Sequence, residues 1–225
     1  MVHNPAVPMI HVPTVPMIHN IPKPIRRLTS SWLTWEMPPG GKTIYLTFDD
    51  GPEPQVTPRV AQILAEYDAR ATFFVSGSKA RVHPRTVDML TAAGHALGNH
   101  GFDHLRGFWT PASEYLADVQ KCAGIVPSRL FRPPYGSLRP GLVRRLRKKG
   151  YEICMWSVTS RDYDPRLSPG QCLDHCLRRS VDGSVLLFHD TPLAARNILY
   201  ALPRLLEHFS AKGFRFQAWT REWVR

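Results

Sequence analysis

The chain has 225 residues, of which 43% are hydrophobic, and it carries a formal net charge of +11 at pH 7. This length and composition fit a single globular domain with a sizeable core. No apolar run approaches the ~18 residues of a membrane-spanning helix, so we expect no transmembrane segment. The basic charge favours anionic partners. However, the dense basic stretch at 139–149 has no interleaved aromatic residues, so we expect no nucleic-acid partner.

The N-terminal residues 1–41 differ in composition from the rest of the chain. Six prolines fall within the first 24 residues, and 4–19 holds an eight-residue near-repeat. Because such proline density is incompatible with a regular helix or a central strand, we predict an extended arm followed by an entry segment at 25–37. The main domain is then expected at 42–225. No secretory signal is recognisable in the arm, which favours a cytoplasmic location.

From residue 42 onward, short apolar strands alternate with helical stretches. Strands are expected at 43–48, 71–75, 96–99, 130–132, 152–156, 184–188 and 215–217. Helices are expected between them at 57–67, 85–93, 111–125, 140–149, 168–180 and 194–212. This alternation predicts an α/β fold with a mostly parallel sheet, either open or closed into a barrel. No glycine-rich phosphate loop follows the first strand, which disfavours a nucleotide-binding fold.

Cysteine spacing suggests neither a disulfide framework nor a zinc finger. The four cysteines are Cys122, Cys154, Cys172 and Cys176, and none of them forms a CxxC pair. We therefore expect four buried free thiols.

Two adjacent carboxylates, Asp49 and Asp50, follow the first apolar strand directly, and Gly51-Pro52 then ends it. In α/β folds the chemistry lies at the carboxyl ends of parallel strands. Two such close carboxylates are unfavourable unless a cation joins them or one stays protonated. The alternative is an ordinary turn that happens to contain two Asp residues.

Polar clusters follow four other expected strands as well, at 99–104, 131–136, 156–163 and 188–190. In a parallel barrel all of these clusters meet at one face. His100 and His104 converge if their segment turns helically, and a single carboxylate from the Asp pair would complete a His₂Asp set. Three protein ligands with an open position are typical of a catalytic divalent metal site.

The remaining polar residues at these strand ends suggest hydrolysis. A bound divalent ion can lower the pKa of its water to about 7. The Asp of the pair that does not bind the ion can then accept the water's proton. His189 can protonate a leaving group, with Asp162 fixing its tautomer. Arg132 can hold the base carboxylate through a charged hydrogen bond. The alternatives are a structural ion pair for Arg132 and a core histidine for His189.

Taken together, these motifs resemble the polysaccharide deacetylases, carbohydrate esterase family four, which include chitooligosaccharide and peptidoglycan N-acetylglucosamine deacetylases. The resemblance covers roughly residues 42–217. Its motifs are Thr-Phe-Asp-Asp-Gly-Pro at 47–52, His-x-x-x-His at 100–104, Arg-Pro-Pro-Tyr-Gly at 132–136, Asp-Tyr at 162–163 and Leu-Phe-His at 187–189. Two positions depart from the family pattern: Gly101 replaces a hydroxyl residue that braces the metal loop, and Tyr163 replaces Trp.

The resemblance implies a distorted (β/α) barrel with about seven parallel strands, with 42–225 as its catalytic domain. It implies that Asp49 is the general base and that Asp50, His100 and His104 hold one divalent metal, with zinc expected and cobalt as a substitute. The implied roles of the other residues are base positioning for Arg132, an oxyanion contact for the backbone N–H of Tyr135, and the general acid for His189, oriented by Asp162.

The resemblance predicts removal of N-acetyl groups from N-acetylglucosamine units of a glycan or oligosaccharide. One alternative is an O-acetyl carbohydrate esterase, because the same site would serve an alkoxide leaving group. Another is a non-catalytic binder of an acidic polymer. The particular glycan and the oligomeric state stay open at this point.

Overall fold

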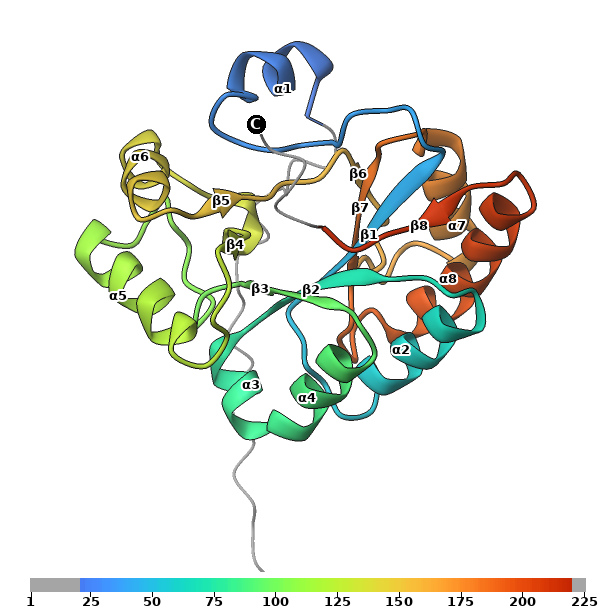
Figure 1. Cartoon of the computed structure of the whole chain (residues 1–225), viewed down its shortest axis with the longest axis horizontal. Helices are drawn as coiled ribbons and strands as arrows, with labels where there is room; N and C mark the ends of the chain where they lie inside the picture. The colour runs from blue at the N-terminus through green and yellow to red at the C-terminus, as the bar shows by residue number, and fades with distance from the viewer. Residues whose placement is uncertain (1–20, 220–225) are drawn as a thin grey trace, which may run out of the picture.

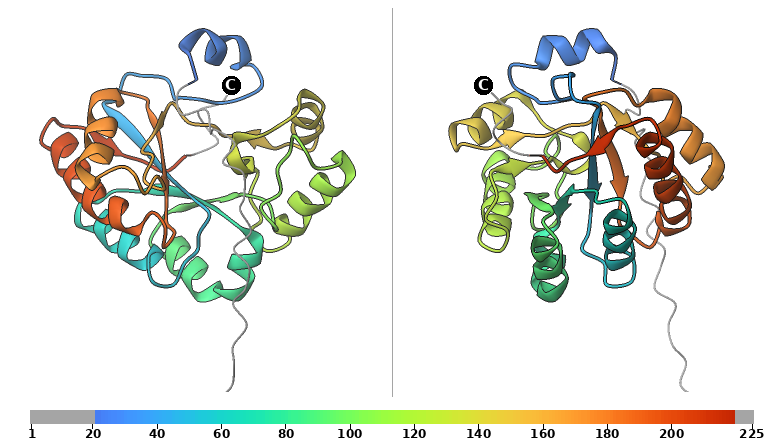
Figure 2. Two further views of the ribbon diagram at one scale, coloured as in Figure 1. Left: turned by 180° about the vertical axis from the view of Figure 1, so that it is seen from behind. Right: turned by 45° about the vertical axis from the view of Figure 1, so that its right-hand side comes forward.

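The computed structural model describes residues 21–219; the predicted arm at 1–20 and the residues 220–225 lie outside the described part. A curved sheet forms the centre of the molecule, and helices cover its outer face (Figures 1 and 2). The helices are α1 Lys23–Thr29, α2 Thr57–Glu66, α3 Gly77–Val82, α4 Pro84–Ala92, α5 Ala112–Ala123, α6 Pro140–Lys148, α7 Pro169–Arg179 and α8 Ala195–Ser210, with a 3₁₀ turn at Pro134–Gly136. The strands are β1 Thr43–Asp49, β2 Ala71–Val75, β3 Ala96–Asn99, β4 Leu130–Phe131, β5 Glu152–Ile153, β6 Val158–Thr159, β7 Val185–His189 and β8 Arg215–Phe216.

The sheet has the strand order β5-β4-β3-β2-β1-β7-β6, and all of its pairings are parallel. β8 pairs with the first residues of β1. The expected α/β fold, a distorted barrel with about seven parallel strands, is therefore confirmed, and the sheet curls into a half-barrel. The expected strand at 152–156 is too long, because β5 ends at Ile153. The carbonyl groups of Cys154 and Met155 instead accept hydrogen bonds from the Arg132 side chain.

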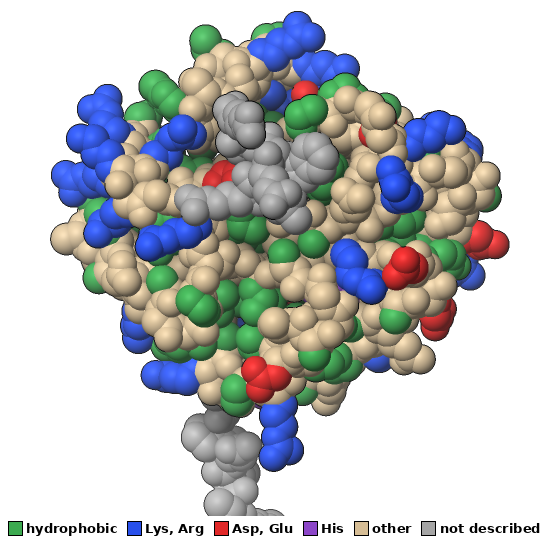
Figure 3. Space-filling view, in the orientation of Figure 1, with side chains coloured by type: hydrophobic (Ala, Val, Ile, Leu, Met, Phe, Trp, Pro, Cys, Tyr) green, Lys and Arg blue, Asp and Glu red, His purple; other side chains and the backbone are tan. Residues whose placement is uncertain are grey.

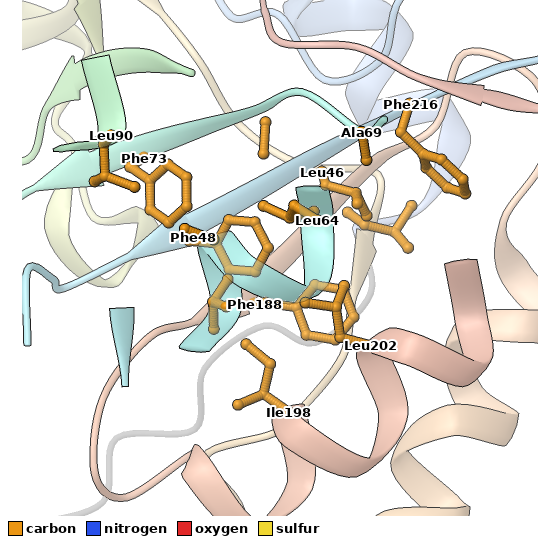
Figure 4. Packing of buried hydrophobic residues seen from close by; sticks show 14 of the residues in the cluster. Leu46, Phe48, Leu64, Ala69, Phe73, Leu90, Phe188, Ile198, Leu202 and Phe216 are labelled. Atoms are coloured by element: carbon orange, nitrogen blue, oxygen red, sulfur yellow. The ribbon is translucent and has the colours of Figure 1, made fainter. Parts of the chain in front are cut away.

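β1 separates two hydrophobic cores by the alternation of its side chains. Ile44, Leu46 and Phe48 pack in the core that also holds the buried faces of α2 and α8. There the Phe48 ring stacks on Phe73 with centroids 4.8 Å apart (Figure 4). Tyr45 belongs to the second core. Because Thr47 and Asp49 share the face of Tyr45, the strand delivers Asp49 to the side opposite α2 and α8.

The entry segment connects distant parts of the sheet. Thr34 forms a parallel bridge with Cys154, just after β5, and Glu36 forms an antiparallel bridge with Ser184, just before β7. The Met37 N–H also donates to the Gly183 carbonyl, 2.9 Å away. Residues 34–37 therefore extend across the side of the half-barrel that the sheet leaves open.

The four cysteines are buried and free, as expected. Among residues 21–219, no helix is both long enough and apolar enough to cross a membrane.

Candidate active site

The base of the site is a buried ion pair below the carboxyl end of β1. Asp49 is 3% exposed, and its Oδ1 accepts a hydrogen bond from Arg132 Nη1 at 2.8 Å. The same Nη1 lies 2.6 Å from Thr47 Oγ1, while Nε and Nη2 donate to the carbonyls of Cys154 and Met155 at 3.1 and 2.8 Å. Arg132 is completely buried, so this set of acceptors fixes the guanidinium and, through it, one oxygen of Asp49.

Asp50, His100 and His104 converge on one point above this pair. Asp50 Oδ1 lies 2.9 Å from His104 Nε2 and 3.3 Å from His100 Nε2. One ligand atom from each residue lies within 4.8 Å of the others, which is compatible with a single bound ion.

The hydrogen bonding of His100 also suits a metal ligand. Its Nδ1 lies 2.8 Å from the Arg132 carbonyl oxygen, which can only accept, so the hydrogen-bond pattern assigns the proton to Nδ1. The Nε2 lone pair is thereby free to bind a cation. Burial alone would raise the pKa of Asp50, but the adjacent imidazoles of His100 and His104 hold it well below its ordinary value, so this carboxylate is anionic. The donor set fits a divalent metal ion.

Three residues of the site have left-handed backbone conformations that favour glycine. The φ angles of Asp50, His104 and Tyr135 are +74°, +56° and +60°. Such conformations are unfavourable for residues with a Cβ and persist where surrounding contacts impose them. They turn three side chains towards one cavity at points where a regular strand or helix would direct them elsewhere.

The loop at 100–104, which carries His100 and His104 and is called the metal loop below, is held by a residue of α5 that the sequence did not indicate. Asp118 accepts hydrogen bonds from the N–H groups of Phe102 and Asp103 at 2.9 and 2.8 Å. Gly101 has a φ of +75°, and a Cβ built there would lie 2.7 Å from Asp118 Oδ2. The Asp118 carboxylate therefore occupies the space next to Gly101 and braces the loop at the position where the family has a hydroxyl residue. Asp118 shares the buried face of α5 with Tyr115, Val119 and Cys122, and an acidic residue in phase with these apolar residues is the signal that the sequence offers.

His189 and Asp162 form the second ionisable pair. Asp162 Oδ1 lies 2.8 Å from His189 Nδ1, and Oδ2 accepts from the His189 backbone N–H at 2.7 Å. Burial lowers the pKa of His189, but the adjacent Asp162 carboxylate, with smaller contributions from Asp50 and Asp49, outweighs this and raises the pKa to about 9. The Tyr163 ring meets the imidazole edge-on, with centroids 5.0 Å apart. His189 is therefore positively charged at neutral pH.

Asp190 is a further residue to which sequence reasoning gave no role. It accepts hydrogen bonds from the Gly51 N–H, at 3.1 Å, and from the Thr57 hydroxyl. Burial raises its pKa to about 7. A Cβ at Gly51 would lie 2.1 Å from Asp190 Oδ2, so only glycine fits there. Asp190 thus ties the loop after β1 to the end of β7. The sequence placed it directly after His189 but gave no sign of these contacts.

A cavity of about 180 Å³ brings most of the predicted site residues together. Its lining consists of Asp49, Asp50, His100, His104, Tyr135, Gly136, Trp156, Tyr163, Leu187, His189, Thr191 and Leu193. Arg132 and Asp162 are fully buried and contact the lining residues Asp49 and His189. A carboxylate, a cationic imidazole and a three-residue donor set for a metal therefore face one small volume.

Comparison with known proteins agrees with this geometry. Residues 36–154 match the family profile described as polysaccharide deacetylase. A peptidoglycan-N-acetylglucosamine deacetylase of Bacillus cereus is 31% identical over 196 residues, covering 83% of this chain and 91% of that protein. A chitooligosaccharide deacetylase of Azorhizobium caulinodans is 38% identical over 156 residues, covering 66% and 73% of the two chains.

Solved structures lead to the same family. The crystal structure of a peptidoglycan N-acetylglucosamine deacetylase superposes with a TM-score of 0.81 at 27% identity, covering 87% of this chain and 94% of that one. A family member from Bacillus anthracis described as a pseudoenzyme also superposes, with a TM-score of 0.74 at 25% identity over 82% of this chain and 66% of that one. Fold, site geometry and sequence similarity agree, and the chain belongs to the polysaccharide deacetylase family, carbohydrate esterase family four.

Proposed function

We propose that this protein is a metal-dependent hydrolase that removes the N-acetyl group from N-acetylglucosamine-type units of a glycan and releases acetate. One observation carries the proposal: the anchored carboxylate Asp49 and the cationic His189 line the same cavity as Asp50, His100 and His104. Binding a glycan requires neither a base nor an acid, whereas hydrolysis of an amide requires both.

Asp49 is the base in this proposal. Arg132 holds its Oδ1, so Oδ2 is the oxygen that accepts a proton from the attacking water. As the water oxygen forms its bond to the acetyl carbon, that proton moves to Asp49. Asp50, His100 and His104 would hold a divalent cation, and we propose zinc because the donors are imidazoles and a carboxylate. The cation would polarise the acetyl carbonyl and lower the pKa of the attacking water.

His189 is the acid. The bond between the acetyl carbon and the amide nitrogen breaks as His189 gives its Nε2 proton to that nitrogen, and the products are acetate and a free amine. Asp162 keeps the imidazole protonated and holds its Nδ1, so Nε2 is the nitrogen directed away from the pair. We assign the backbone N–H of Tyr135 to the developing oxyanion, and residues 42–225 to the catalytic domain.

The test is acetate release from N-acetylglucosamine oligomers by the purified protein, after chelation and again after zinc or cobalt is returned. Release that depends on the returned metal is expected. Release from O-acetylated but not N-acetylated glycans would instead make the protein an O-acetyl esterase. A metal-loaded protein that binds glycan in a salt-dependent way without turnover would be a non-catalytic binder.

Two substitutions separate the assigned roles. Asp49→Asn is expected to retain one equivalent of metal while losing most turnover, because only the proton acceptor is removed. His104→Ala is expected to lose metal, with His83→Ala as a control outside the site. Full activity in Asp49→Asn would contradict the base assignment, and unchanged metal content in His104→Ala would contradict the ligand assignment.

A further inference from the structure

Helix α1 and the turn after it expose a stripe of large apolar side chains. α1 buries none of its residues. Ile25, Leu28 and Trp32 are 49%, 84% and 53% exposed. Their spacing of three and four residues places them on one side of a helical turn, which continues through the hydrogen bond from the Trp32 N–H to the Thr29 carbonyl. Contiguous exposed apolar residues of this size mark an interaction surface more often than isolated ones do.

Next to this stripe, Trp32 forms one wall of a groove of about 350 Å³. The opposite wall is one face of α6, formed by Pro140, Val143, Arg144, Arg147 and Lys148. The lining thus combines an indole ring with three cations and no acidic residue. In Figure 3, Lys and Arg side chains gather over α6 and over α1 on the face shown.

Most of the cations around the stripe have no ion-pair partner among residues 21–219. Arg26 pairs with Glu36 and is neutralised. In contrast, Lys23, Arg27, Arg144, Arg147 and Lys148 take part in none of the ion pairs found within residues 21–219. Five unpaired positive charges therefore flank three uncovered apolar side chains.

We propose that this stripe and groove bind the surface of an anionic phospholipid membrane. A soluble polyanion would satisfy the cations but leave Leu28 and Ile25 in water. An apolar protein partner would cover the stripe but has no need of five cations. A bilayer with anionic headgroups meets both requirements, because acyl chains receive the apolar residues while the headgroups pair with Lys and Arg. The positive charge of the groove complements the negative headgroups. Trp32 and Lys148 have apolar stems and polar ends, which suit the boundary between headgroups and acyl chains.

The proposed orientation leaves the catalytic cavity accessible. In Figures 1 and 2, α1 lies at the end of the molecule opposite α3. The N–H of Gly77, the first residue of α3, donates to the carbonyl of Gly101 in the metal loop at 2.9 Å. A bilayer that contacts α1 would thus lie remote from the metal loop, and a glycan could enter the cavity from the far side.

Vesicle flotation with the full chain tests the proposal. We expect binding to phosphatidylcholine vesicles that contain phosphatidylglycerol and little binding to phosphatidylcholine alone. Replacing Arg144, Arg147 and Lys148 with Gln should lower the partition coefficient about 100-fold, because each of the three cations near an anionic surface contributes about a fivefold factor. Replacing the pair Arg59 and Arg85 with Gln on other helices should have little effect.

The apolar residues are tested separately. Leu28→Ser should weaken vesicle binding by roughly tenfold or more, since the side chain loses its burial among acyl chains. Val181→Ser is the control, because Val181 is likewise an exposed apolar residue, at 64%, and lies outside the stripe. Thermal melting of each variant should match that of the parent protein, so that any loss of binding reflects the surface and not the fold.

Quenching by brominated lipids identifies the residue that enters the bilayer. Trp32→Phe should abolish the quenching that binding produces, whereas Trp109→Phe should preserve it, although Trp109 is 73% exposed. The proposal is overturned by equal binding to vesicles with and without anionic lipid, or by quenching that depends on Trp109. It is also overturned if Leu28→Ser binds vesicles normally and inorganic polyphosphate displaces the protein, because the partner would then be a soluble polyanion.

Discussion

The pairing of Asp162 with His189 makes a prediction about pH dependence. Asp162→Asn removes the negative charge that keeps His189 protonated, while burial of the imidazole remains. Because Asp162 contributes most to the raised pKa, the pKa of His189 should fall from about 9 towards the ordinary value of about 6.5. This decrease corresponds to about 3 kcal/mol of lost stabilisation of the imidazolium.

The consequence for the general acid depends on pH. At pH 8 a group with a pKa of about 9 is about 90% protonated, but one with a pKa near 6.5 is only about 3% protonated. Turnover of Asp162→Asn should thus be about 30-fold lower than that of the parent at pH 8, and less than about twofold lower at pH 6. The sign follows from the raised pKa: activity is present below it and is lost as the pH rises through it.

The assay is a profile of kcat/KM for acetate release against pH, with metal content checked at each pH. The alkaline limb of Asp162→Asn should move down by about two pH units or more. Asp164→Asn is the matched control, because Asp164 pairs with Arg161 and Arg166 and not with His189. An alkaline limb that stays in place in Asp162→Asn, or a defect of equal size at both pH values, would refute the assignment of His189 as an acid held by Asp162.

Two further predictions concern the loops around the site. Asp118→Asn should raise the zinc dissociation constant about 10-fold or more by releasing the metal loop, whereas Asp103→Asn should leave it unchanged; equal affinities in equilibrium dialysis would rule out a bracing role. Gly51→Ala should lower the free energy of unfolding by about 1–3 kcal/mol, because the new methyl group collides with the Asp190 carboxylate. In urea denaturation Gly141→Ala serves as control, since a Cβ there meets nothing within 4 Å, and a fully stable Gly51→Ala would contradict the collision.

The fold could be predicted where local pattern and tertiary pairing agree. β2 and β3 begin and end where the sequence indicated, because each is an apolar run bounded by turn residues. β6 was missed, since Val158 and Thr159 form a strand only by pairing with β7, which lies far along the chain. α3 was missed as well, because six residues without a side-chain cap carry little helical signal.

The site shows a similar division. That Asp50, His100 and His104 come together was predictable, because the two histidines lie close in sequence and Asp50 directly follows a strand. The conformations that direct these side chains were not predictable, since a left-handed φ at Asp50 or His104 is imposed by contacts from elsewhere. The role of Asp118 was equally hidden, because its partners lie on a loop that only the folded chain brings to α5.

The bridges made by residues 34–37 have a consequence for the order in which the chain assembles during synthesis. Thr34 leaves the ribosome about 120 residues before its partner Cys154, and Glu36 about 148 residues before Ser184. At the usual speeds of translation, these intervals amount to roughly 6–30 seconds. During that time residues 34–37 have no backbone partner for these bridges, so a segment that is synthesised before the domain at 42–225 is among the last to reach its final position.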